Sequence, residues 1–368
     1  MKIMYFITTS DWGGASKYVY ELCKYEIERG NEVYFVTGSK GLLLEKVKEL
    51  GNVKTFVINS VNRSIDPLND LKSIFIIRRL VSQIKPDIIH LNSSKAGIIG
   101  RLACIGKKTK VIFTVHGWSF TEGIGSNLKK FIYKTIEKSV SRFTDLFICV
   151  SEYDKRLGIE KKVLNNKTPV VVIYNGSSKP VDDQVNFSAH VPIRLVMVAR
   201  FSPQKNQRAL IEAVRGFPKD KYHLVFVGEG ETMQSCKNLV KSLDLKDNIE
   251  FLGFKDDVTK ELIENDVCLL ITHYEGLPIS IIEAMSYGLP IIASDVGGNR
   301  ELVINNENGY LVNNAKDIQN SITKLINNPD LVKKMGETSY KLYKNKFTIS
   351  KNTESVNKEY ERLLSKCI

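Results

Sequence analysis

The chain contains the stretch Asp266-Val-Cys-Leu-Leu-Ile-Thr-His-Tyr-Glu-Gly-Leu-Pro-Ile-Ser-Ile-Ile-Glu283, which predicts a strand, a loop and a helix in direct succession. Residues 266–272 form a short apolar run that is typical of a buried parallel strand. Glu275 then falls in the loop at the carboxyl end of this strand, the edge of an α/β sheet where ligands collect. Pro278 suits the first helical position, because its missing N–H costs nothing there. The stretch therefore predicts an α/β fold with a ligand site at this edge.

Two carboxylates of this stretch, Glu275 and Glu283, lie eight positions apart, one before and one inside the predicted helix. Glu283 has mostly apolar neighbours, and burying a carboxylate there is costly unless it is hydrogen-bonded, for example to two sugar hydroxyls. The amides of Ile279 and Ser280 would form an anion site at the helix N-terminus. The alternative is structural: one Glu at a helix start and a second paired with a Lys or Arg.

The chain has 368 residues, which suits two domains of ordinary size. Its hydrophobic content of 43% and charged content of 26% are ordinary for a globular protein. No apolar run approaches the roughly 18 residues of a membrane span, and residues 1–9 predict an opening strand rather than a secretory signal. The six cysteines have no C-x-x-C spacing, which favours a reducing cytoplasm.

The net charge of +12 is concentrated in the first half of the chain. Residues 1–180 carry 29 basic and 16 acidic residues, whereas residues 181–368 carry 24 and 25. The positive electrostatic field of the first half favours an anionic partner, either a membrane surface or a phosphorylated acceptor. Nucleic acid is not expected, because the sequence has no zinc-finger spacing, RNA-recognition signature or basic helix entering a heptad repeat.

Short β-branched and aromatic runs alternate with amphipathic stretches, which predicts parallel sheets covered by helices on both faces. Expected strands in the first half are 2–9, 32–38, 53–58, 87–92, 110–116, 146–150 and 170–174, with helices such as 14–29, 68–84 and 126–143. After an irregular linker around 176–193, strands are expected at 194–199, 222–227, 249–252, 267–272, 290–294 and 309–312, and a helical tail from about 329. We predict two doubly wound Rossmann-like domains facing across a cleft, residues 1–178 and 179–349.

Basic residues follow the first strand of the second domain. Arg200 and Lys205 could reach one pyrophosphate, the Arg through its fork and the Lys as a point charge. Two cations can replace a divalent metal in neutralising a departing nucleoside diphosphate. The alternative is that both side chains are simply solvated.

Two strand-end loops of the first domain carry further candidates. Gly13 and Gly14 start the first helix, where a backbone can approach a phosphate and helix-start amides are free. His116 ends an apolar strand and precedes Gly117, which would direct it into the cleft. An ordinary strand–helix turn and a structural histidine remain the alternatives.

The candidate loops, taken in chain order, resemble the retaining family-4 glycosyltransferases with the GT-B fold. The matching motifs are Asp11-Trp-Gly-Gly-Ala15, Val115-His116-Gly117, Ala199-Arg200 with Lys205, Val227-Gly-Glu-Gly230, Phe251-Leu-Gly253, Glu275-x₇-Glu283 and Ser294-Asp-Val-Gly-Gly298. The likeness spans essentially the full chain and is greatest to bacterial enzymes of capsule, exopolysaccharide or cell-wall glycan assembly.

The resemblance implies a role for each matching residue. Glu275 would contact hydroxyls of the donor sugar and Glu283 those of the ribose, while His116 would lie near the anomeric centre. Arg200 and Lys205 would hold the diphosphate. Other donor-site residues, acting largely through backbone groups, would be Gly13, Gly14, Gly253, Phe254, Gly276, Leu277, Pro278 and Ile279. The last helix, from about residue 350, would pack back on the first domain.

The implied reaction moves a hexosyl or N-acetylhexosaminyl group from a UDP-sugar to a lipid-linked or glycan acceptor, such as a polyprenyl-diphosphate-linked sugar. No cofactor and no metal is expected, in agreement with the absence of Asp-x-Asp from the sequence. The expected location is the cytoplasm, with peripheral association at the inner face of the plasma membrane. The basic helix 127–143 could carry Leu128, Phe131, Ile132, Thr135 and Val140 on one face and Lys130, Lys134 and Lys138 on another. Together with Lys107, Lys108 and Lys110 it could rest on anionic lipid, or it could pack on the sheet with its other face solvated.

Other functions remain open at this point. A nucleotide-sugar epimerase or hydrolase of the same fold would use a similar site, and a non-catalytic subunit of a glycan-assembling complex could keep the fold. A dehydrogenase would need a glycine fingerprint, but Met233 occupies its third glycine position after Gly228 and Gly230. There is also no P-loop motif.

Overall fold

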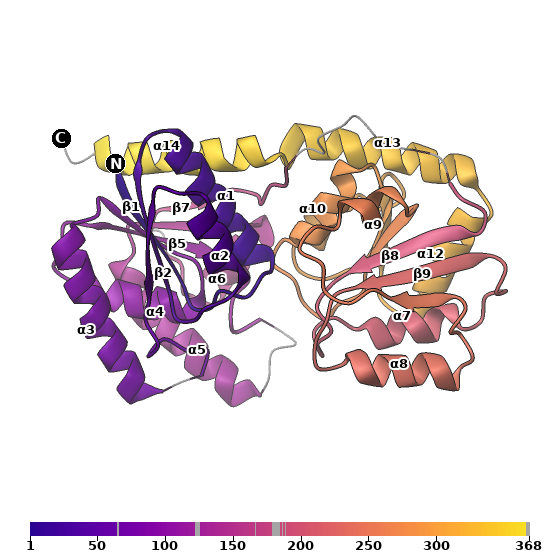
Figure 1. Ribbon diagram of the computed structural model, residues 1–368, viewed down its shortest axis with the longest axis horizontal. Helices are drawn as coiled ribbons and strands as arrows, with labels where there is room; N and C mark the ends of the chain where they lie inside the picture. The colour runs from indigo at the N-terminus through magenta and orange to yellow at the C-terminus, as the bar shows by residue number, and fades with distance from the viewer. Residues whose placement is uncertain are drawn as a thin grey trace. The chain divides into compact units, whose positions relative to one another are not determined.

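A computed structural model of the chain describes residues 1–64, 66–121, 126–165, 167–178, 185, 187 and 189–365. It comprises two compact units (Figure 1): unit 1 is residues 1–174 with 350–368, and unit 2 is residues 175–349. The predicted domain boundary, between residues 178 and 179, lies close to this division. Much of the predicted linker, residues 179–184, 186 and 188, falls outside the described residues.

Unit 1 contains a parallel sheet with the strand order β3-β2-β1-β4-β5-β6-β7 in the described part of the chain. The strands are β1 (Lys2–Ile7), β2 (Glu32–Thr37), β3 (Val53–Val57), β4 (Ile88–Leu91), β5 (Lys110–Val115), β6 (Leu146–Cys149) and β7 (Val170–Val172). Its helices are α1 (Gly14–Glu28), α2 (Leu42–Glu49), α3 (Pro67–Ile84), α4 (Ser94–Ala103), α5 (Asn127–Val140), the 3₁₀ helix η1 (Ser141–Phe143), α6 (Glu152–Glu160) and α14 (Ile349–Ser365). All strands predicted before residue 175 are confirmed.

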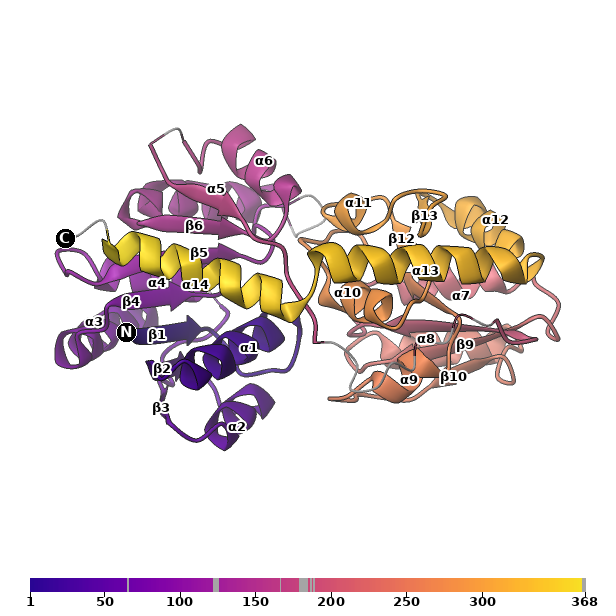
Figure 2. The same ribbon diagram turned by 90° about the horizontal axis from the view of Figure 1, so that it is seen from above.

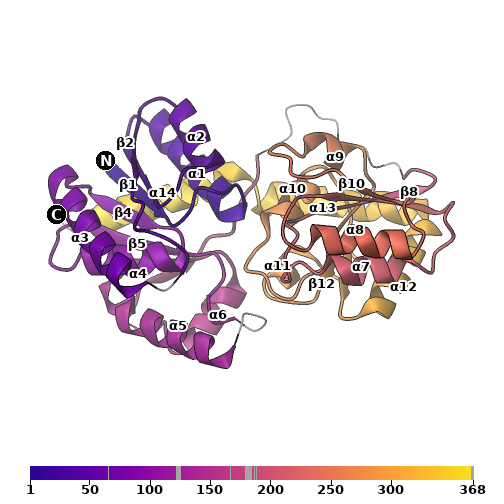
Figure 3. The ribbon, with the colours of Figure 1, turned by 60° about the horizontal axis from the view of Figure 1, so that its bottom comes forward.

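Unit 2 repeats this architecture with the strand order β10-β9-β8-β11-β12-β13, again all parallel. The strands are β8 (Ile193–Val198), β9 (Tyr222–Val227), β10 (Ile249–Phe251), β11 (Val267–Leu270), β12 (Ile291–Ser294) and β13 (Gly309–Val312). Its helices are α7 (Gln207–Val214), α8 (Met233–Ser242), α9 (Thr259–Ile263), α10 (Ile279–Ser286), α11 (Asn299–Leu302), α12 (Ala315–Ile326) and α13 (Pro329–Lys346). Helices α7, α8 and α12 cover one face of this sheet, and α9, α10 and α13 the other (Figures 1 and 3). None of the helices in the described ranges is both long and apolar enough to cross a bilayer.

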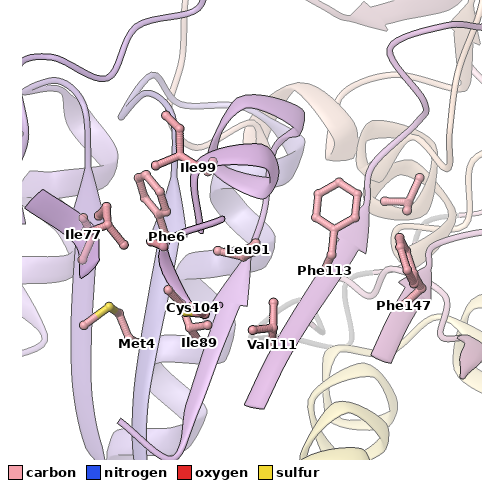
Figure 4. Close-up of a cluster of buried hydrophobic side chains, with 14 of the residues drawn as sticks. Met4, Phe6, Ile77, Ile89, Leu91, Ile99, Cys104, Val111, Phe113 and Phe147 are labelled. Carbon is pink, nitrogen blue, oxygen red and sulfur yellow. The ribbon is translucent and has the colours of Figure 1, made fainter. Parts of the chain in front are cut away.

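One face of the unit 1 sheet packs against α3 and α4. Ile77 of α3 and Ile99 of α4 meet alternate residues of the central strands there (Figure 4), namely Met4, Phe6, Ile89, Leu91, Val111 and Phe113. Each such side chain contributes roughly 1.5–3 kcal/mol when it is fully buried. The intervening strand residues point to the other face, where α1 and α14 lie.

The C-terminal tail is broken into two helices rather than one. The break occurs at Phe347 and Thr348, where Ser177 pairs with Thr348 and the Ser177 N–H donates to the Phe347 carbonyl oxygen (3.0 Å). Beyond it, α14 lies along the unit 1 sheet (Figure 2). The hydroxyl of its Tyr360 lies 2.5 Å from His90 Nδ1. A residue near the chain end therefore contacts the centre of the first sheet.

The amphipathic helix α5 does not pack its apolar stripe on the sheet. Leu128, Phe131 and Ile132 are exposed, whereas Val140 and Glu137 are buried. The expectation that Val140 shares a face with the other apolar residues is therefore wrong. The alternative, in which the apolar face packs on the sheet, is also wrong for the exposed residues. The side of α5 that packs on the rest of unit 1 is the one that carries Glu137 and Val140.

A buried carboxylate on α1 provides a test of the unit 1 packing. Glu26 is fully buried; Asn31 Nδ2 donates to its Oε2 (2.6 Å), and its Oε1 has no hydrogen-bond partner. Burial raises the pKa of Glu26 to about 7, and the Asn31 hydrogen bond only partly opposes this. A carboxyl whose pKa is raised by folding stabilises the fold below its unfolded value, and this stabilisation is lost as the pH rises through 7.

We expect Glu26→Gln to remove this pH dependence, because Gln is neutral at every pH. The unfolding free energy of the variant relative to wild type should rise between about pH 5 and pH 8, by on the order of 3 kcal/mol for a shift of this size. Urea unfolding of both proteins at several pH values measures this difference, in which contributions from unchanged groups cancel. Parallel curves would show that the Glu26 carboxyl titrates normally.

Candidate active site

The loops that follow β8 and β11 meet at the centre of unit 2. The chain runs outward from β8 through β9 to β10, whereas β11 lies on the other side of β8. In α/β sheets, ligands bind at the carboxyl ends of the strands where the strand order reverses in this way. The His273 N–H donates to the Gln204 carbonyl oxygen (2.9 Å), and Gln204 Nε2 donates to the Tyr274 carbonyl oxygen (2.7 Å). These bonds join the two loops.

The predicted residues Lys205 and Glu275 form an ion pair at this junction, although they are 70 positions apart in sequence. Their side chains are 17% and 8% exposed, so both charges are largely removed from water. A lysine ammonium has three protons and no acceptor, so it can hold Glu275 and still donate elsewhere. The pair therefore positions a cation and a carboxylate together before any ligand arrives.

Arg200 lies in the same loop as Lys205 and is exposed. Burial and the charge of Glu275 raise the pKa of Tyr274, and the charge of Arg200 opposes this rise. The Tyr274 side chain is therefore within electrostatic reach of both Arg200 and Glu275. The structure brings Lys205 and Glu275 into contact, and it places Arg200 in the same loop as Lys205 without a hydrogen bond or ion pair to Glu275.

Helix α10 begins beside this cluster with its first amides uncapped by any side chain. Pro278 is the N-cap residue rather than the first helical residue, so its expected position was one place too far into the helix. Glu283 is half-buried instead of enclosed by apolar groups, and it lies one turn after Ser280, which is also half-buried, on the one open face of α10. Glu283 stays partly exposed because the buried sides of α10 are occupied by its isoleucines and Met285.

Paired glycines in unit 2 allow close packing of backbones around the acidic loop. A Cβ on Gly297 would lie 2.0 Å from the Glu275 carbonyl oxygen, and one on Gly298 2.0 Å from that of Gly276. The Gly298 N–H also donates to the Gly276 oxygen (3.0 Å). The Gly-Gly turn therefore supports the loop that carries Glu275.

The predicted base-binding segment lies at the carboxyl end of β10. Gly253 has a positive φ of 75°, and its carbonyl oxygen accepts from the Gly228 N–H (2.7 Å). Phe254 is an exposed large apolar side chain, 47% accessible. The backbone of this turn is therefore ordered by Gly228, while Phe254 is open to solvent.

In unit 1, His116 follows β5 and its ring packs edge-on against Tyr18 at 4.8 Å between centroids. Burial lowers the pKa of His116 to about 3, so the imidazole is neutral near pH 7. His116 Nε2 lies 3.4 Å from Asn92 Oδ1, and Asn92 Nδ2 donates to the His90 carbonyl oxygen (3.0 Å). Asn92 was not predicted, although a polar residue directly after the apolar strand β4 is a usable signal.

Gly13 and Gly14 lie at the start of α1, which also has no side-chain cap. Gly13 is extended (φ −178°), and a Cβ there would meet nothing within 4 Å, so neither strain nor packing of the free protein requires a glycine. Arg63, another residue that the sequence did not predict, pairs with Asp11 (2.8 Å) beside this helix start. Arg63 lies in the loop that follows β3, and no sequence motif in this loop indicates a functional residue.

Comparisons with known proteins identify the family of the chain. Residues 12–178 match the model for Glycosyltransferase Family 4, and residues 178–342 match that for Glycosyl transferases group 1. The chain is 30% identical over 327 residues to the Escherichia coli UDP-Gal:alpha-D-GlcNAc-diphosphoundecaprenol alpha-1,3-galactosyltransferase, covering 84% of each chain. It is 31% identical to the E. coli O-antigen biosynthesis glycosyltransferase WbnH, covering 85% of this chain and 86% of the relative.

Solved structures show the same fold. HepE from Anabaena, in complex with UDP and glucose, superposes with a TM-score of 0.82 at 20% identity, covering 98% of this chain and 99% of HepE. Sucrose-phosphate synthase from Thermosynechococcus elongatus gives a TM-score of 0.84 at 20% identity and 99% coverage of both chains. The fold is that of GT-B glycosyltransferases. The chain therefore belongs to the family-4 glycosyltransferases, and it is a glycosyltransferase of the kind that includes bacterial O-antigen enzymes.

Proposed function

We propose that this glycosyltransferase moves a sugar from a UDP-sugar to a polyprenyl-diphosphate-linked sugar in the assembly of a bacterial surface polysaccharide. The observation that carries the proposal is the Lys205–Glu275 ion pair beside the uncapped start of α10. A cation and free amides suit the diphosphate, and a carboxylate suits sugar hydroxyls. The relative whose name specifies a UDP-galactose donor and a diphosphoundecaprenol acceptor supports both substrate classes.

The proposal includes a role for each donor-site residue. Lys205, Arg200 and the amides of Leu277 and Ile279 hold the diphosphate, and Glu275 orients the donor sugar. Glu283, on the open face of α10, takes the ribose hydroxyls. The backbone at Gly253 and Phe254 takes the base, and the α1 start at Gly13 and Gly14 adds further amides.

The reaction retains the anomeric configuration. As the bond from the anomeric carbon to the diphosphate oxygen breaks, negative charge grows on the leaving group and is stabilised by Lys205 and Arg200. The acceptor hydroxyl attacks from the face that the leaving group vacates, and its proton passes to the departing phosphate oxygen. Neutral His116 can hydrogen-bond to the sugar without adding a positive charge near the oxocarbenium-like carbon.

These two cations also support a reaction without metal, because they neutralise the charge that Mg²⁺ or Mn²⁺ would otherwise hold. Transfer rates should be the same in EDTA and in added Mg²⁺. A loss of activity in EDTA that is restored by Mg²⁺ would contradict metal independence while leaving the transferase assignment intact.

The direct test incubates the protein with a panel of UDP-sugars and polyprenyl-diphosphate-linked N-acetylglucosamine. We expect one donor to give a lipid product heavier by one sugar residue, detected by mass spectrometry. NMR of the product reports the anomeric configuration. Rapid turnover of donor without acceptor would favour the hydrolase or epimerase, and no turnover of any donor would favour the non-catalytic subunit.

The basic first half of the chain supports peripheral binding at the inner face of the plasma membrane, where a lipid-linked acceptor resides. Helix α5 carries four lysines and one glutamate. Each basic residue near an anionic surface changes binding about fivefold. We expect Lys129→Gln combined with Lys138→Gln, both exposed, to weaken flotation with anionic vesicles at low salt by about 25-fold. Unchanged flotation of this variant would show that Lys129 and Lys138 do not contribute to membrane binding.

A further inference from the structure

A row of buried polar side chains crosses the face of the unit 1 sheet on which α1 and α14 lie (Figure 2). Tyr5 of β1 is the register partner of His90 of β4. Thr114 of β5 lies on the same face, because it is two residues beyond the partner of His90. Tyr18 of α1 and Tyr360 of α14 pack edge-on against the His90 ring. All five, which we call the buried polar row, are at most 2% exposed.

The opposite face of the same three strands is apolar at the neighbouring positions. The side chains that meet α3 and α4 there are Met4, Phe6, Ile89, Leu91, Val111 and Phe113 (Figure 4). Burying a polar group costs free energy unless it finds a hydrogen-bond partner. Packing of helices on this sheet therefore does not by itself account for the buried polar row.

Hydrogen bonds join the members of the row in series. The Tyr360 hydroxyl lies 2.5 Å from His90 Nδ1 and donates to the Tyr5 hydroxyl (3.3 Å). His90 Nε2 lies 2.6 Å from Thr114 Oγ1, which in turn lies 3.2 Å from the Tyr18 hydroxyl. Burial lowers the pKa of His90 to about 3, so the ring is neutral near pH 7. A neutral imidazole has one donor and one acceptor nitrogen, so it can bridge two hydroxyls.

The row ends beside His116, at the carboxyl end of β5. The Tyr18 ring, whose hydroxyl is held by Thr114, packs edge-on against the His116 ring with 4.8 Å between centroids. His116 is partly exposed, whereas every member of the row is buried. A ligand at this edge of the sheet can therefore reach His116 but not the residues behind it. The orientation of the His116 ring depends on Tyr18, and through Tyr18 on the row.

We propose that Tyr360 is a positioning residue of the transferase: its hydroxyl holds the His116 ring, through the buried polar row, in the orientation that meets the donor sugar. Without this hydroxyl, His90 Nδ1 loses its partner and the imidazole is free to turn, which loosens Thr114 and then Tyr18. Buried polar networks are rigid when every member has a partner and lose this property when one is missing. The inference rests on the proposed function, because it needs His116 to contact the donor sugar.

The first test is Tyr360→Phe, which removes the hydroxyl and keeps the ring that fills the core. We expect kcat to fall about tenfold, because a misplacement of a fraction of an ångström costs less than the roughly 10²-fold of a full ångström. The assay uses the UDP-sugar of the panel that gives product, with polyprenyl-diphosphate-linked N-acetylglucosamine as acceptor. The affinity for UDP should not change, because Lys205 and the start of α10 belong to unit 2. A folded Tyr360→Phe protein with the wild-type kcat would overturn the proposal.

A double-mutant cycle with His116→Ala separates positioning from a general loss of structure. In the His116→Ala background, Tyr360→Phe should have no further effect on kcat, because the group that Tyr360 positions is already gone. A structural role would lower kcat by the same factor in both backgrounds. That result would overturn the proposal.

The matched control is Tyr343→Phe. Tyr343 is another buried tyrosine of the C-terminal tail, and its hydroxyl donates to the Ser177 carbonyl oxygen (3.1 Å) within unit 2. Its loss removes a comparable hydrogen bond but should leave kcat unchanged, because Tyr343 is outside the buried polar row. An equal fall in both tyrosine variants would contradict a specific role of Tyr360.

Thr114 offers a second break in the row, for the case in which Tyr360→Phe is unfolded at the assay temperature. Thr114→Val keeps the shape of the side chain and removes its hydroxyl, so kcat should fall as in Tyr360→Phe. Thr114→Ser keeps the hydroxyl and should recover most of the lost rate. Equal rates of the valine and serine variants would overturn the proposal.

Nitrogen NMR of the His116 side chain is a readout that needs no turnover. Its Nδ1 and Nε2 resonances, assigned by their loss in His116→Ala, should shift in Tyr360→Phe and stay in place in Tyr343→Phe. Resonances that do not move in Tyr360→Phe would overturn the proposal. Shifted resonances in a protein that transfers no sugar would contradict the proposed function and leave the coupling of Tyr360 to His116 intact.

Discussion

Replacing Lys205 with alanine is expected to lower the rate of sugar transfer by about 10²–10³-fold, because one preorganised donor to the developing diphosphate charge is lost. Lys205 is held by its ion pair with Glu275 before the donor binds. Its loss also leaves the carboxylate without its partner. The measurement is kcat at saturating donor and acceptor, with the affinity for UDP measured separately.

The control for this variant is Lys219→Ala. Lys219 is also ion-paired, with Asp244 at 2.7 Å, but on the exposed surface of unit 2. Its removal should leave kcat unchanged, because exposed pairs contribute little and it is remote from the donor. Thermal melting of both variants shows whether Lys205→Ala is folded at the assay temperature. A folded Lys205→Ala protein with the wild-type rate would contradict the assignment of Lys205.

Gly298→Ala is expected to cost about 10²-fold in kcat although it touches no proposed substrate group. The added Cβ would lie 2.0 Å from the Gly276 carbonyl oxygen, so the loop carrying Glu275 must move. A displacement of about 1 Å in positioning groups can have this effect on rate. Gly298 has φ −78°, which alanine adopts freely, so the loss is steric rather than conformational.

Gly216→Ala is the matched control for this substitution. The nearest atom to a Cβ at Gly216 is Gln319 Nε2 at 3.9 Å, so the methyl group fits without movement. Its kcat and thermal midpoint should stay near those of wild type. Equal activity of Gly298→Ala and Gly216→Ala would show that the Glu275 loop tolerates displacement and that the Gly-Gly turn does not support it.

The sequence predicted the repeating elements well because each one depends on local patterns. The run Val267–Leu270 contains only apolar residues, which predicts a buried strand, and β11 is found there with all four residues buried. The order of strand-end loops also identified the family, since backbone turns and charged residues occur at set places after strands. Lengths of helices near glycines and prolines were predicted to within a few residues, as in α3.

The tertiary structure decided which of these loops meet. Sequence order alone places Lys205 and Glu275 70 residues apart, and they pair because β11 lies beside β8 in the sheet. Asn92 lies close to His116 because β4 and β5, the strands that precede them, are neighbours in the sheet. Tyr18 contacts His116 from helix α1. Gly297 and Gly298 support Glu275 through backbone contacts that no residue pattern records.

Exposure was decided at the same level. The pattern of α5 predicted an apolar stripe but not its direction, and α3 gave no sign that Phe75 would face outward. Periodicity follows from the backbone of one helix, so the amino-acid sequence determined the elements and their polar and apolar sides by itself. Direction and pairing depend on which strand or helix lies alongside, because burial is a property of neighbours that the chain brings together only when it folds.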